Sequence, residues 1–448
     1  MDQGLKYQVH TFGCKVNTYD TGLIQKNLSK NGFTQNSEKI DNLSSTQVHV
    51  LNTCSVTGEA TKQAVKLIRR IKSKQPLSTV VVTGCAAQVD TEQFRQLPGA
   101  DIIVANSHKG LLPQIIDDFY KGKITDKVFK SNIFRKEDLE SGGGLEASHS
   151  RSFLKIQDGC NSFCTYCIIP YARGKSRSIP MKELLKRIQE IAELGVREIV
   201  LTGVHIGDYE DDGKNLEDLV EYLLNKTSNI RYRLTSLEPV ELTERLLNLY
   251  KDSRLCPHFH MSIQSAETNT LKAMKRNYDS DQVVSSLNRI QEQLPHAFIG
   301  MDVIVGFPTE TDEEFNKTFE SLKQSPWTKL HVFPYSERSG TRAAVMTQTV
   351  PQHVRVERAK RLRELSLDRI KAIGTQQIGS IKNVLILKNA KGYHGLSEDY
   401  WPVKIIGADD FAQHWVNEFI QVQVTEIIFN PQSSNEVILQ AEVFHAST

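Results

Sequence analysis

Short apolar runs alternate with polar, helix-compatible stretches through the first part of the chain. The runs are rich in β-branched residues and cover positions 7–12, 48–51, 79–82 and 102–104. Strands that alternate with helices are typical of a parallel sheet with helices packed on it. The pattern predicts an N-terminal α/β domain over residues 1–125. A linker over residues 126–150 follows, because hydrophobicity drops and the stretch contains Ser141-Gly142-Gly143-Gly144.

The alternation of strands and helices resumes at residue 151 in a longer series. Strand-like runs recur near positions 153–156, 199–201, 232–234, 259–263, 298–305 and 330–333, and a helix-compatible segment follows each. Six successive βα units predict a partial (β/α)6 barrel. In barrels of this kind, chemistry gathers where the strands end and the loops begin.

The last part of the chain changes character twice. Residues 353–373 are charged, have apolar positions at helical spacing and contain no Gly or Pro, so a connecting helix is expected at the end of a core domain over residues 151–373. Residues 374–448 carry β-rich runs such as VLIL, FIQVQV and EVILQAEVF, broken by Asn, Gly and Ser. These runs predict a small closed β-barrel. The fold class is therefore multidomain α/β.

Length and composition agree with this division. A chain of 448 residues is too long for one hydrophobic core, and 39% hydrophobic with 24% charged residues is ordinary for a soluble globular protein. No apolar run approaches the roughly 20 residues that span a bilayer, and the N-terminus lacks a basic segment followed by an apolar one. We expect a cytoplasmic protein without membrane association. The net charge of +2 neither favours nor excludes a nucleic-acid partner.

Three of the seven cysteines lie within eight residues, in the spacing Cys-x₃-Cys-x₂-Cys at Cys160, Cys164 and Cys167. A structural zinc site usually has four ligands, and no fourth Cys or His follows at finger spacing. Three thiolates on a four-iron cluster leave one iron open, which suits a cluster that binds a substrate. Buried cysteines without a ligand are the alternative, but the neighbours are Gly, Asn, Ser and Asp.

Three further cysteines each directly follow a predicted strand: Cys14, Cys54 and Cys85. The carboxyl ends of parallel strands meet at one edge of a sheet, so these thiols are expected to converge. A single free cysteine is often simply buried, and we interpret Cys256 in that way. Three at equivalent positions favour a second cluster, again with one open iron.

The Cys-x₃-Cys-x₂-Cys loop, with an aromatic residue before its last cysteine and at the first loop of a β/α barrel, resembles the radical S-adenosylmethionine (SAM) superfamily. The resemblance implies a [4Fe–4S] cluster whose open iron binds SAM and delivers the electron that cleaves it. By position it also implies cofactor contacts, each with an ordinary turn or strand-end cap as the alternative: Thr202, Gly203, Glu238, Gln264, Ser265, Asp302 and Gly306. There is no phosphate-binding loop for ATP.

The order of three-cysteine α/β domain, radical SAM core and small β-barrel resembles the methylthiotransferase family along essentially the whole chain. Residues 11–17, Thr-Phe-Gly-Cys-Lys-Val-Asn, are similar to the variant in enzymes that act on N6-threonylcarbamoyladenosine in tRNA. The stretches Tyr-Cys-Ile-Ile-Pro-Tyr-Ala-Arg-Gly (166–174), Leu-Thr-Gly-Val-His (201–205) and Leu-His-Val-Phe-Pro-Tyr-Ser (330–336) point the same way. Asn106 and Lys109 also resemble the family's first domain, although an ordinary surface loop is the alternative there.

What this resemblance implies is a monomeric tRNA methylthiotransferase with two [4Fe–4S] clusters and SAM. It converts N6-threonylcarbamoyladenosine beside the anticodon to its 2-methylthio derivative, with electrons from a flavodoxin-like or ferredoxin-like donor. The alternatives are the same reaction on isopentenyladenosine in tRNA or on a ribosomal protein. From another class, a non-catalytic iron–sulfur or zinc RNA-binding protein remains open.

An RNA substrate calls for local positive charge, because phosphate contacts dominate affinity. Three stretches qualify, although each is also compatible with a solvated surface: residues 62–74, with Lys62, Lys66, Arg69, Arg70, Lys72 and Lys74; Arg173, Lys175 and Arg177; and residues 355–363, with Arg355, Arg358, Lys360, Arg361 and Arg363. The C-terminal barrel resembles the RNA-binding domain TRAM through residues 392–400. From residue 376 onward it has four Lys or Arg against eight Asp or Glu, so exposed aromatics (Tyr393, Tyr400 and Trp401) are expected to stack on bases. Alternatively, the barrel mainly supports the core.

Overall fold

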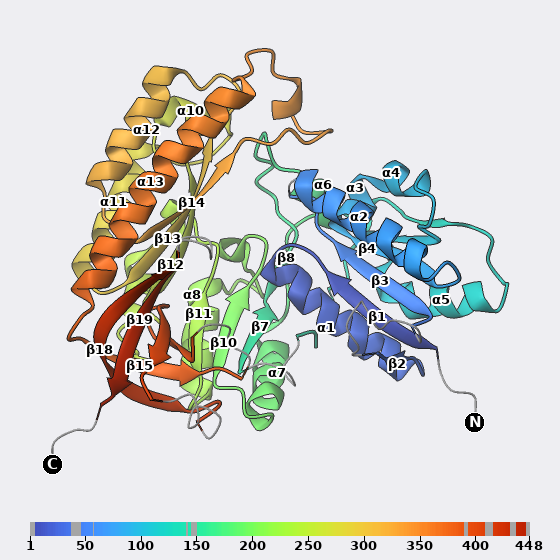
Figure 1. The fold of residues 1–448 in the computed structure, drawn as a ribbon, viewed down its shortest axis with the longest axis horizontal. Helices are drawn as coiled ribbons and strands as arrows, with labels where there is room; N and C mark the ends of the chain where they lie inside the picture. Colours follow the sequence, from blue (N-terminus) through green and yellow to red (C-terminus); the bar gives the residue numbers. More distant parts are fainter. Residues whose placement is uncertain are drawn as a thin grey trace.

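The computed structural model describes residues 5–36, 46–56, 58–139, 142–144, 150–388, 393–407, 415–430 and 436–444. The N-terminal domain is a six-stranded parallel sheet in the order β2-β1-β3-β4-β5-β6 (Figure 1). Its strands are β1 (Lys6–Thr11), β2 (Thr34–Gln35), β3 (Val48–Thr53), β4 (Thr79–Gly84), β5 (Ile102–Ala105) and β6 (Val128–Phe129). The α/β parallel-sheet class predicted from the sequence is confirmed.

Helices cover both faces of this sheet. Helices α1 (Lys15–Lys30) and α5 (Leu112–Tyr120) pack on one face against the apolar side chains of β3 and β5. Helices α2 (Gly58–Lys74), α3 (Cys85–Val89) and α4 (Thr91–Arg95) pack on the other. Strands β3 and β4 are therefore buried on both sides, which explains why they read as continuous apolar runs in the sequence.

The two edge strands were not predicted, because each has only two residues and no apolar run. Strand β6 pairs in parallel with β5 and lies inside residues 126–150, the segment expected as a linker. A short 3₁₀ helix, η3 (Ile133–Arg135), follows it and buries Ile133. The expected linker is thus corrected: its first part belongs to the N-terminal domain. Of the run Ser141-Gly142-Gly143-Gly144 in this segment, Ser141 lies outside the described residues.

The core domain contains the six predicted strands: β7 (Arg151–Lys155), β10 (Glu198–Thr202), β11 (Arg231–Leu234), β12 (His258–Gln264), β13 (Phe298–Val305) and β14 (Lys329–Pro334). They pair in parallel as β11-β10-β7 and β12-β13-β14, and single parallel bridges at Tyr232–Leu255 and Leu237–Met261 join the two halves. A partial barrel results. Strands β7 and β14 are its unpaired margins.

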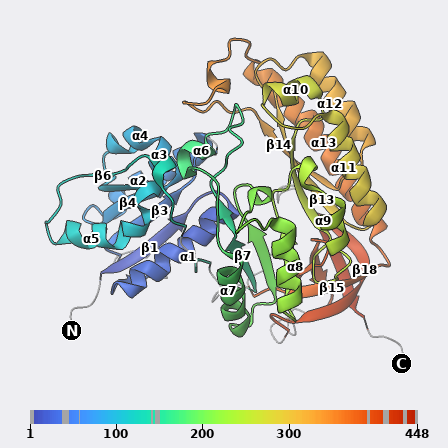
Figure 2. The same ribbon diagram turned by 180° about the vertical axis from the view of Figure 1, so that it is seen from behind.

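Helices cover the outside of the core (Figure 2): α7 (Met181–Glu193), α8 (Leu216–Lys226), α9 (Glu244–Leu249), α10 (Thr268–Ala273), α11 (Ser280–Gln293) and α12 (Asp312–Gln324). Reciprocal side-chain to backbone bonds fix where α8, α11 and α12 begin, for example between Thr311 and Glu314. At the first loop, the short antiparallel strands β8 (Gln157–Asp158) and β9 (Arg177–Ser178) enclose α6 (Ile169–Arg173).

The connecting helix α13 (Gln352–Gln376) leads into a closed five-stranded barrel, as predicted. Its strands are β15 (Ile381–Ile386), β16 (Gly395–Ser397), β17 (Pro402–Ile405), β18 (Phe419–Asn430) and β19 (Glu436–Val443). The barrel lies under the amino-terminal ends of the core strands. There Arg231 of β11 donates to the Leu396 carbonyl oxygen (2.7 Å), and Arg233 donates to that of Ser397 (2.8 Å).

Two of the three aromatics expected to stack on RNA bases are engaged within the protein. Trp401 is 2% exposed in the core of the small barrel. Tyr400 packs against the ring of His258, with centroids 4.0 Å apart, and the Arg233 guanidinium lies 4.9 Å from its ring centre. The prediction is corrected for both, because a barrel this small needs large side chains to fill it and to seal it to the core. Tyr393 is half-buried, and Gly392 lies outside the described residues. None of the described helices is long and apolar enough to cross a membrane.

Candidate active site

The loop that follows β7 places Cys160, Cys164 and Cys167 at the carboxyl end of the partial barrel. Its turn requires a glycine: Gly159 has φ +79°, and a Cβ there would lie 2.0 Å from the Lys175 carbonyl oxygen. Farther along, Thr165 anchors the loop through its amide to the Met274 carbonyl (3.1 Å) and its hydroxyl to the Ala273 carbonyl (2.9 Å). All three thiols line one cavity of about 360 Å³.

Side chains from the ends of the later strands form the rest of this cavity. Of the seven predicted cofactor contacts, Glu238, Gln264 and Asp302 line it. The other four lie outside the lining formed by the described residues. Thr202 is buried below the strand end, Gly203 packs on Gln157, the Ser265 hydroxyl bonds Thr318 (3.1 Å), and Gly306 packs on Arg355.

Two charged side chains at the cavity were missed by the sequence analysis. Arg276 donates to the Cys164 sulfur (3.0 Å) and also pairs with Glu238. His205 lies with Nδ1 3.9 Å from the Cys160 sulfur and with Nε2 2.5 Å from Glu241 Oε1. A motif that contains His205 was recognised in the sequence. Arg276 follows α10, and nothing in the surrounding sequence marks it.

The charges around the thiols differ from one cysteine to the next. Burial works against ionising Cys160, but hydrogen bonds from His205 and Ser162 prevail and lower the pKa of its thiol. Burial raises the pKa of Cys164, and it raises that of Cys167 to about 12. Although burial opposes it, hydrogen bonds to Asp208 and Glu241 raise the pKa of His205 well above its usual value. The donor atoms of Cys160, His205 and Asp208 lie within 4.8 Å of one another, and Cys160 is one of the three cysteines of the loop.

The second set of cysteines lies at three neighbouring strand ends of the N-terminal sheet. Cys14 caps α1 after β1, Cys54 follows β3, and Cys85 begins α3 after β4. The chain at Gly13 comes so close that a Cβ there would lie 2.6 Å from the Cys54 sulfur, and Gly13 has φ +91°. Burial, with the nearby Cys85 and Cys14 thiols, raises the pKa of Cys54 to about 12.

This donor set suits a bound cluster. All seven cysteines, each within the described part of the chain, are free thiols, and Cys14 is exposed while Cys54 and Cys85 are buried. Asn17 holds two of the strand ends together by donating to the carbonyls of Phe12 (2.7 Å) and Thr53 (3.1 Å). The thiols therefore project from a rigid edge, as a cluster site requires.

Arg173 connects the two sets of cysteines. It belongs to α6, directly after the Cys160 loop, and donates to the Cys85 sulfur (3.2 Å) and to both Asp158 oxygens (3.0 Å each). It also donates to the Asn17 side-chain oxygen (2.6 Å) and to Asp20 (3.1 Å). Arg173 is 4% exposed, so its expected role as an RNA-binding cation is corrected: it is an internal ionic contact between the domains.

Lysines complete the same network. Lys155 bonds Asp20 (2.7 Å) and Asp158 (3.0 Å), and Lys109 bonds Asp20 (2.9 Å). Asn106 donates to the Ala172 carbonyl (2.9 Å) and lies 3.7 Å from the Cys85 sulfur. Asn106 and Lys109 are thus part of the domain interface, and the alternative of an ordinary surface loop is wrong.

The basic stretches expected to contact RNA have different surroundings. On α13, Arg355 and Arg358 are buried and pair with Glu337 (3.2 Å) and Glu310 (2.5 Å), so the expectation is corrected for these two. Lys72 of α2 pairs with Asp101 (2.7 Å). The exposed cations of the same stretches are Lys62, Lys66, Arg69, Arg70, Lys74, Lys175, Lys360 and Arg363.

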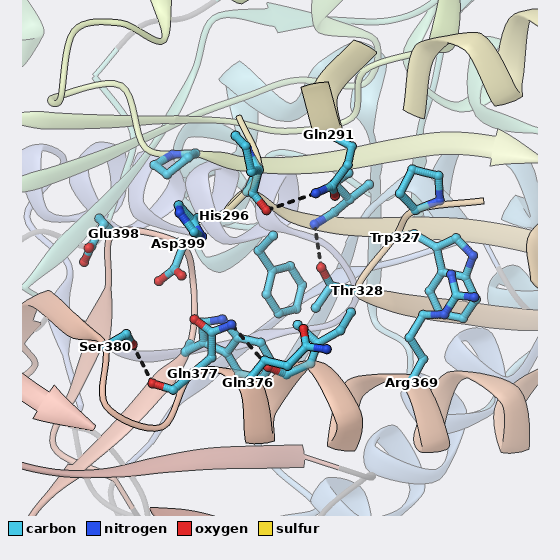
Figure 3. Close-up of a pocket in the computed structure, with 18 of the residues that line it drawn as sticks. Gln291, His296, Trp327, Thr328, Arg369, Gln376, Gln377, Ser380, Glu398 and Asp399 are labelled. Carbon is cyan, nitrogen blue, oxygen red and sulfur yellow. Dashed lines mark hydrogen bonds between the residues drawn. The ribbon is translucent and has the colours of Figure 1, made fainter. Parts of the chain in front are cut away.

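A larger cavity, of about 810 Å³, lies at the opposite end of the core (Figure 3). It opens between the amino ends of β13 and β14, helix α13 and the small barrel. Trp327 and Arg369 stack on one side, with the guanidinium 4.0 Å from the ring centre, and His296 and Asp399 lie across from them. None of the described side chains that line it is a thiol, so it is separate from the candidate site.

Family models match both of the domains that carry these cysteines. The family model described as the Radical SAM superfamily matches residues 154–322, and the model of Uncharacterized protein family UPF0004 matches residues 6–105. Among solved structures, the radical S-adenosylmethionine methyltransferase TsrM from Kitasatospora setae has a TM-score of 0.57 at 12% identity over 77% of each chain. At that identity the likeness concerns the fold alone.

Curated relatives align along nearly the whole chain. The threonylcarbamoyladenosine tRNA methylthiotransferase MtaB of Aquifex aeolicus is 34% identical over 403 residues, which cover 89% of this chain and 96% of the relative. The protein of the same name from Bacillus subtilis is 33% identical over 429 residues, or 93% of this chain and 92% of the relative. The tRNA-2-methylthio-N(6)-dimethylallyladenosine synthase of Rickettsia conorii is 30% identical over 86% of this chain and 89% of its own.

Proposed function

This chain belongs to the radical SAM methylthiotransferase family, and we propose that it converts N6-threonylcarbamoyladenosine beside the anticodon of tRNA to its 2-methylthio derivative. The substrate is supported by relatives named for it, which are 31–35% identical over at least 85% of this chain. The observation that carries the reaction is that the cavity lined by the core cysteines reaches the N-terminal domain close to one of its cysteines. Val56, two residues after Cys54, lines the same cavity as Cys160, Cys164 and Cys167.

We assign the six cysteines to two [4Fe–4S] clusters. When bound, a cluster with SAM at Cys160, Cys164 and Cys167 supplies the radical chemistry that removes hydrogen from adenine C2, and one at Cys14, Cys54 and Cys85 supplies the sulfur. The described residues support such sites. Arg276 balances charge at Cys164, and the buried Arg173 brings a cation to Cys85. Both contacts place a positive charge beside a sulfur that would be negative as a metal ligand.

Other residues of the cavity suit a planar base and exclude water. Phe333 of β14 is 46% exposed although it is a large apolar side chain, and it lines the cavity. An aromatic face of this kind is a stacking surface for a base that has left its RNA stack. Val56, 52% exposed, adds an apolar contact from the N-terminal domain. Glu238 and Gln264 offer polar atoms at the strand ends for SAM.

The exposed cations of α2 are proposed to hold the tRNA. This helix begins at Gly58, next to the cavity wall at Val56, and carries Lys62, Lys66 and Arg69 at its surface. The electron donor is proposed to be a flavodoxin-like or ferredoxin-like protein. The chain is proposed to act as a monomer.

Analysis of modified nucleosides tests the substrate. A strain that lacks this gene is expected to lose 2-methylthio-N6-threonylcarbamoyladenosine and to accumulate the precursor, and the gene on a plasmid restores the product. If the threonylcarbamoyl product stays intact and the 2-methylthio derivative of isopentenyladenosine disappears, the substrate assignment is wrong. Loss of a ribosomal-protein modification would refute it equally.

Anaerobic reconstitution tests the two clusters. About eight irons per chain and release of 5′-deoxyadenosine are expected, because each cluster holds four irons. Replacing Cys85 by alanine is expected to lower the iron to about four and abolish methylthio transfer, while 5′-deoxyadenosine release continues. The matched control is Cys256→Ala, since Cys256 is also a buried free cysteine. Bound zinc without SAM cleavage would favour the non-catalytic alternative, and methylthio transfer by Cys85→Ala would refute the second cluster.

A further inference from the structure

The partial barrel of the core is open at its side, between β7 and β14, and the N-terminal domain lies beside β7 there. Among the described strands, β7 and β14 are not hydrogen-bonded to each other, and helix α1 packs against β7 (Figure 1). The first residue of α1 is Lys15, which directly follows Cys14. A side chain at this position therefore lies where the N-terminal domain meets the interior of the barrel.

Side chains on the inner face of the barrel form a polar group below the cavity. Alternation along β13 and β14 places Asp302 on the same face as Ile304, and His331 on the same face as Phe333. Of these, Asp302, Ile304 and Phe333 line the cavity of the candidate site. Just beneath, His260 Nε2 donates a hydrogen bond to the Asp302 carboxylate (3.0 Å), and its ring lies 5.5 Å from that of His331.

The floor of the interior is closed and positively charged. Glu198 is fully buried and is paired with three arginines, Arg151, Arg231 (2.5 Å) and Arg233 (3.0 Å). One carboxylate thus faces three guanidinium groups. Arg231 and Arg233 use further donors on carbonyl oxygens of the small barrel, and Tyr400 covers Arg233 and Arg151. Every arginine of this floor already has protein partners.

Lys15 is a further cation in this interior, besides Lys329, which lies at the start of β14 on the same face as His331. Its ammonium interacts electrostatically with Asp302 on the cavity wall and with Tyr400, Arg151 and Arg233 at the floor. The side chain is partly buried, yet it makes no hydrogen bond or ion pair with any of the described residues. The Asp302 carboxylate is already hydrogen-bonded to His260, and Arg151 and Arg233 are the two arginines near Lys15. An ammonium with three open donors in a positive surrounding favours an anionic ligand group.

We propose that Lys15 binds the threonyl carboxylate of the N6-threonylcarbamoyl group and so selects this substrate. The inference rests on the proposed function and adds the residue that recognises the substrate's charge. With adenine C2 toward the thiols and the ring on Phe333, the N6 substituent projects away from C2 along the inner face, toward His260 and Lys15. An isopentenyl group carries no anion and would leave the ammonium unpaired in a partly dry site. Such a loss is the usual basis of strong discrimination.

Binding of modified RNA measures this contact without relying on turnover. The probes are an anticodon stem-loop RNA with N6-threonylcarbamoyladenosine, the same RNA with the threonyl carboxylate as its methyl ester, and the RNA with unmodified adenosine. Affinities are measured anaerobically on the chain holding both clusters. The variants are Lys15→Met, which keeps the length of the side chain, and Lys15→Arg, which keeps its charge. Lys182→Met removes an exposed lysine from α7 as the matched control. Iron content and melting temperature show whether each variant is loaded and folded.

The wild-type chain is expected to bind the free acid about 10- to 100-fold more tightly than the ester, the range of a charge-assisted hydrogen bond. In Lys15→Met the two RNAs bind equally, whereas Lys15→Arg and Lys182→Met keep most of the difference. The comparison of acid and ester in the wild-type chain stands even if Lys15→Met does not fold.

Three results would overturn the inference. Lys15→Met could keep the full preference for the acid, or it could weaken all three RNAs equally, which is a general charge effect. It could also lose affinity for SAM while keeping the preference for the acid, which would assign Lys15 to the carboxylate of SAM. A wild-type chain that binds threonylcarbamoyl and unmodified RNA alike would refute the proposed substrate itself.

Discussion

Replacing Arg173 by methionine tests whether the ionic network between the domains holds the two sets of cysteines together. The side chain is buried and makes hydrogen bonds to Asp158, Asp20, Asn17 and the Cys85 sulfur. Methionine has a similar length and fills much of the space, so the change removes charge and hydrogen bonds more than volume. The prediction is a large loss of stability, because both carboxylates are buried.

The expected magnitude follows from what remains after the change. Breaking one partner of a buried ion pair costs about 3–5 kcal/mol. Lys155 still bonds both Asp20 and Asp158, and Lys109 still bonds Asp20, so neither carboxylate loses every cation. The loss should therefore lie at the lower end, about 3 kcal/mol. Arg173→Lys should lose less, because it keeps the charge but not the planar fork of donors.

Urea unfolding of the iron-free chain at pH 7, followed by circular dichroism, measures this loss. The matched control is Arg245→Met. Arg245 pairs with three carboxylates, Asp218 (2.9 Å), Glu221 (2.6 Å) and Glu217 (3.6 Å), but its side chain is 46% exposed. An exposed pair contributes about 0–1 kcal/mol, so the control should change the free energy of unfolding by less than that. If Arg173→Met costs no more than Arg245→Met, the network does not hold the domains together and the reasoning is refuted.

Two further predictions concern pH and RNA. Burial, reinforced by His49, lowers the pKa of His10 from 6.5 to about 4, so the unfolded chain takes up this proton more readily than the folded chain. The corresponding stability is present above pH 6.5 and is lost as the pH decreases toward 4. Between pH 7 and 5 the loss is about 2 kcal/mol, and urea unfolding at the two pH values should show a smaller loss for His10→Gln. Equal losses in both chains would contradict this. The second prediction replaces three exposed cations of α2, Lys62, Lys66 and Arg69, by alanine. The slope of the logarithm of the tRNA binding constant against the logarithm of the salt concentration should become less steep by up to about 2–3. Replacing the exposed Lys182 of α7 should leave that slope unchanged.

The sequence was sufficient for the larger elements, because their signals are local. Each of the six core strands contains its own apolar run, so it can be recognised without knowing its tertiary contacts. The connecting helix has apolar residues at helical spacing over most of its length. Strands β2 and β6 have two residues each, and their pairing comes from a neighbouring strand distant in sequence. The local pattern of apolar and polar residues therefore does not reveal strands β2 and β6.

The candidate site shows the same division. The cysteines were recognisable because their spacing and their positions after strands are local features. The place of Arg173 was not, because a basic residue near a cluster looks the same in the sequence whether it faces RNA or an aspartate. Its partner Asp20 lies 153 positions away, on a different domain. Arg355 and Arg358 were misjudged for the same reason, since their acidic partners come from other elements.

The charges around Arg173 suggest why the second set of cysteines belongs to this interface. Three cations, Lys109, Lys155 and Arg173, share two buried carboxylates, Asp20 and Asp158, so one positive charge is left over. Besides the neutral Asn17 side-chain oxygen (2.6 Å), the other acceptor of Arg173 outside the carboxylates is the sulfur of Cys85, at 3.2 Å. A neutral thiol balances no charge, whereas a thiolate that ligates metal does. The network therefore reaches charge balance when Cys85 is a ligand, and binding metal at the N-terminal cysteines should strengthen the attachment of that domain to the core.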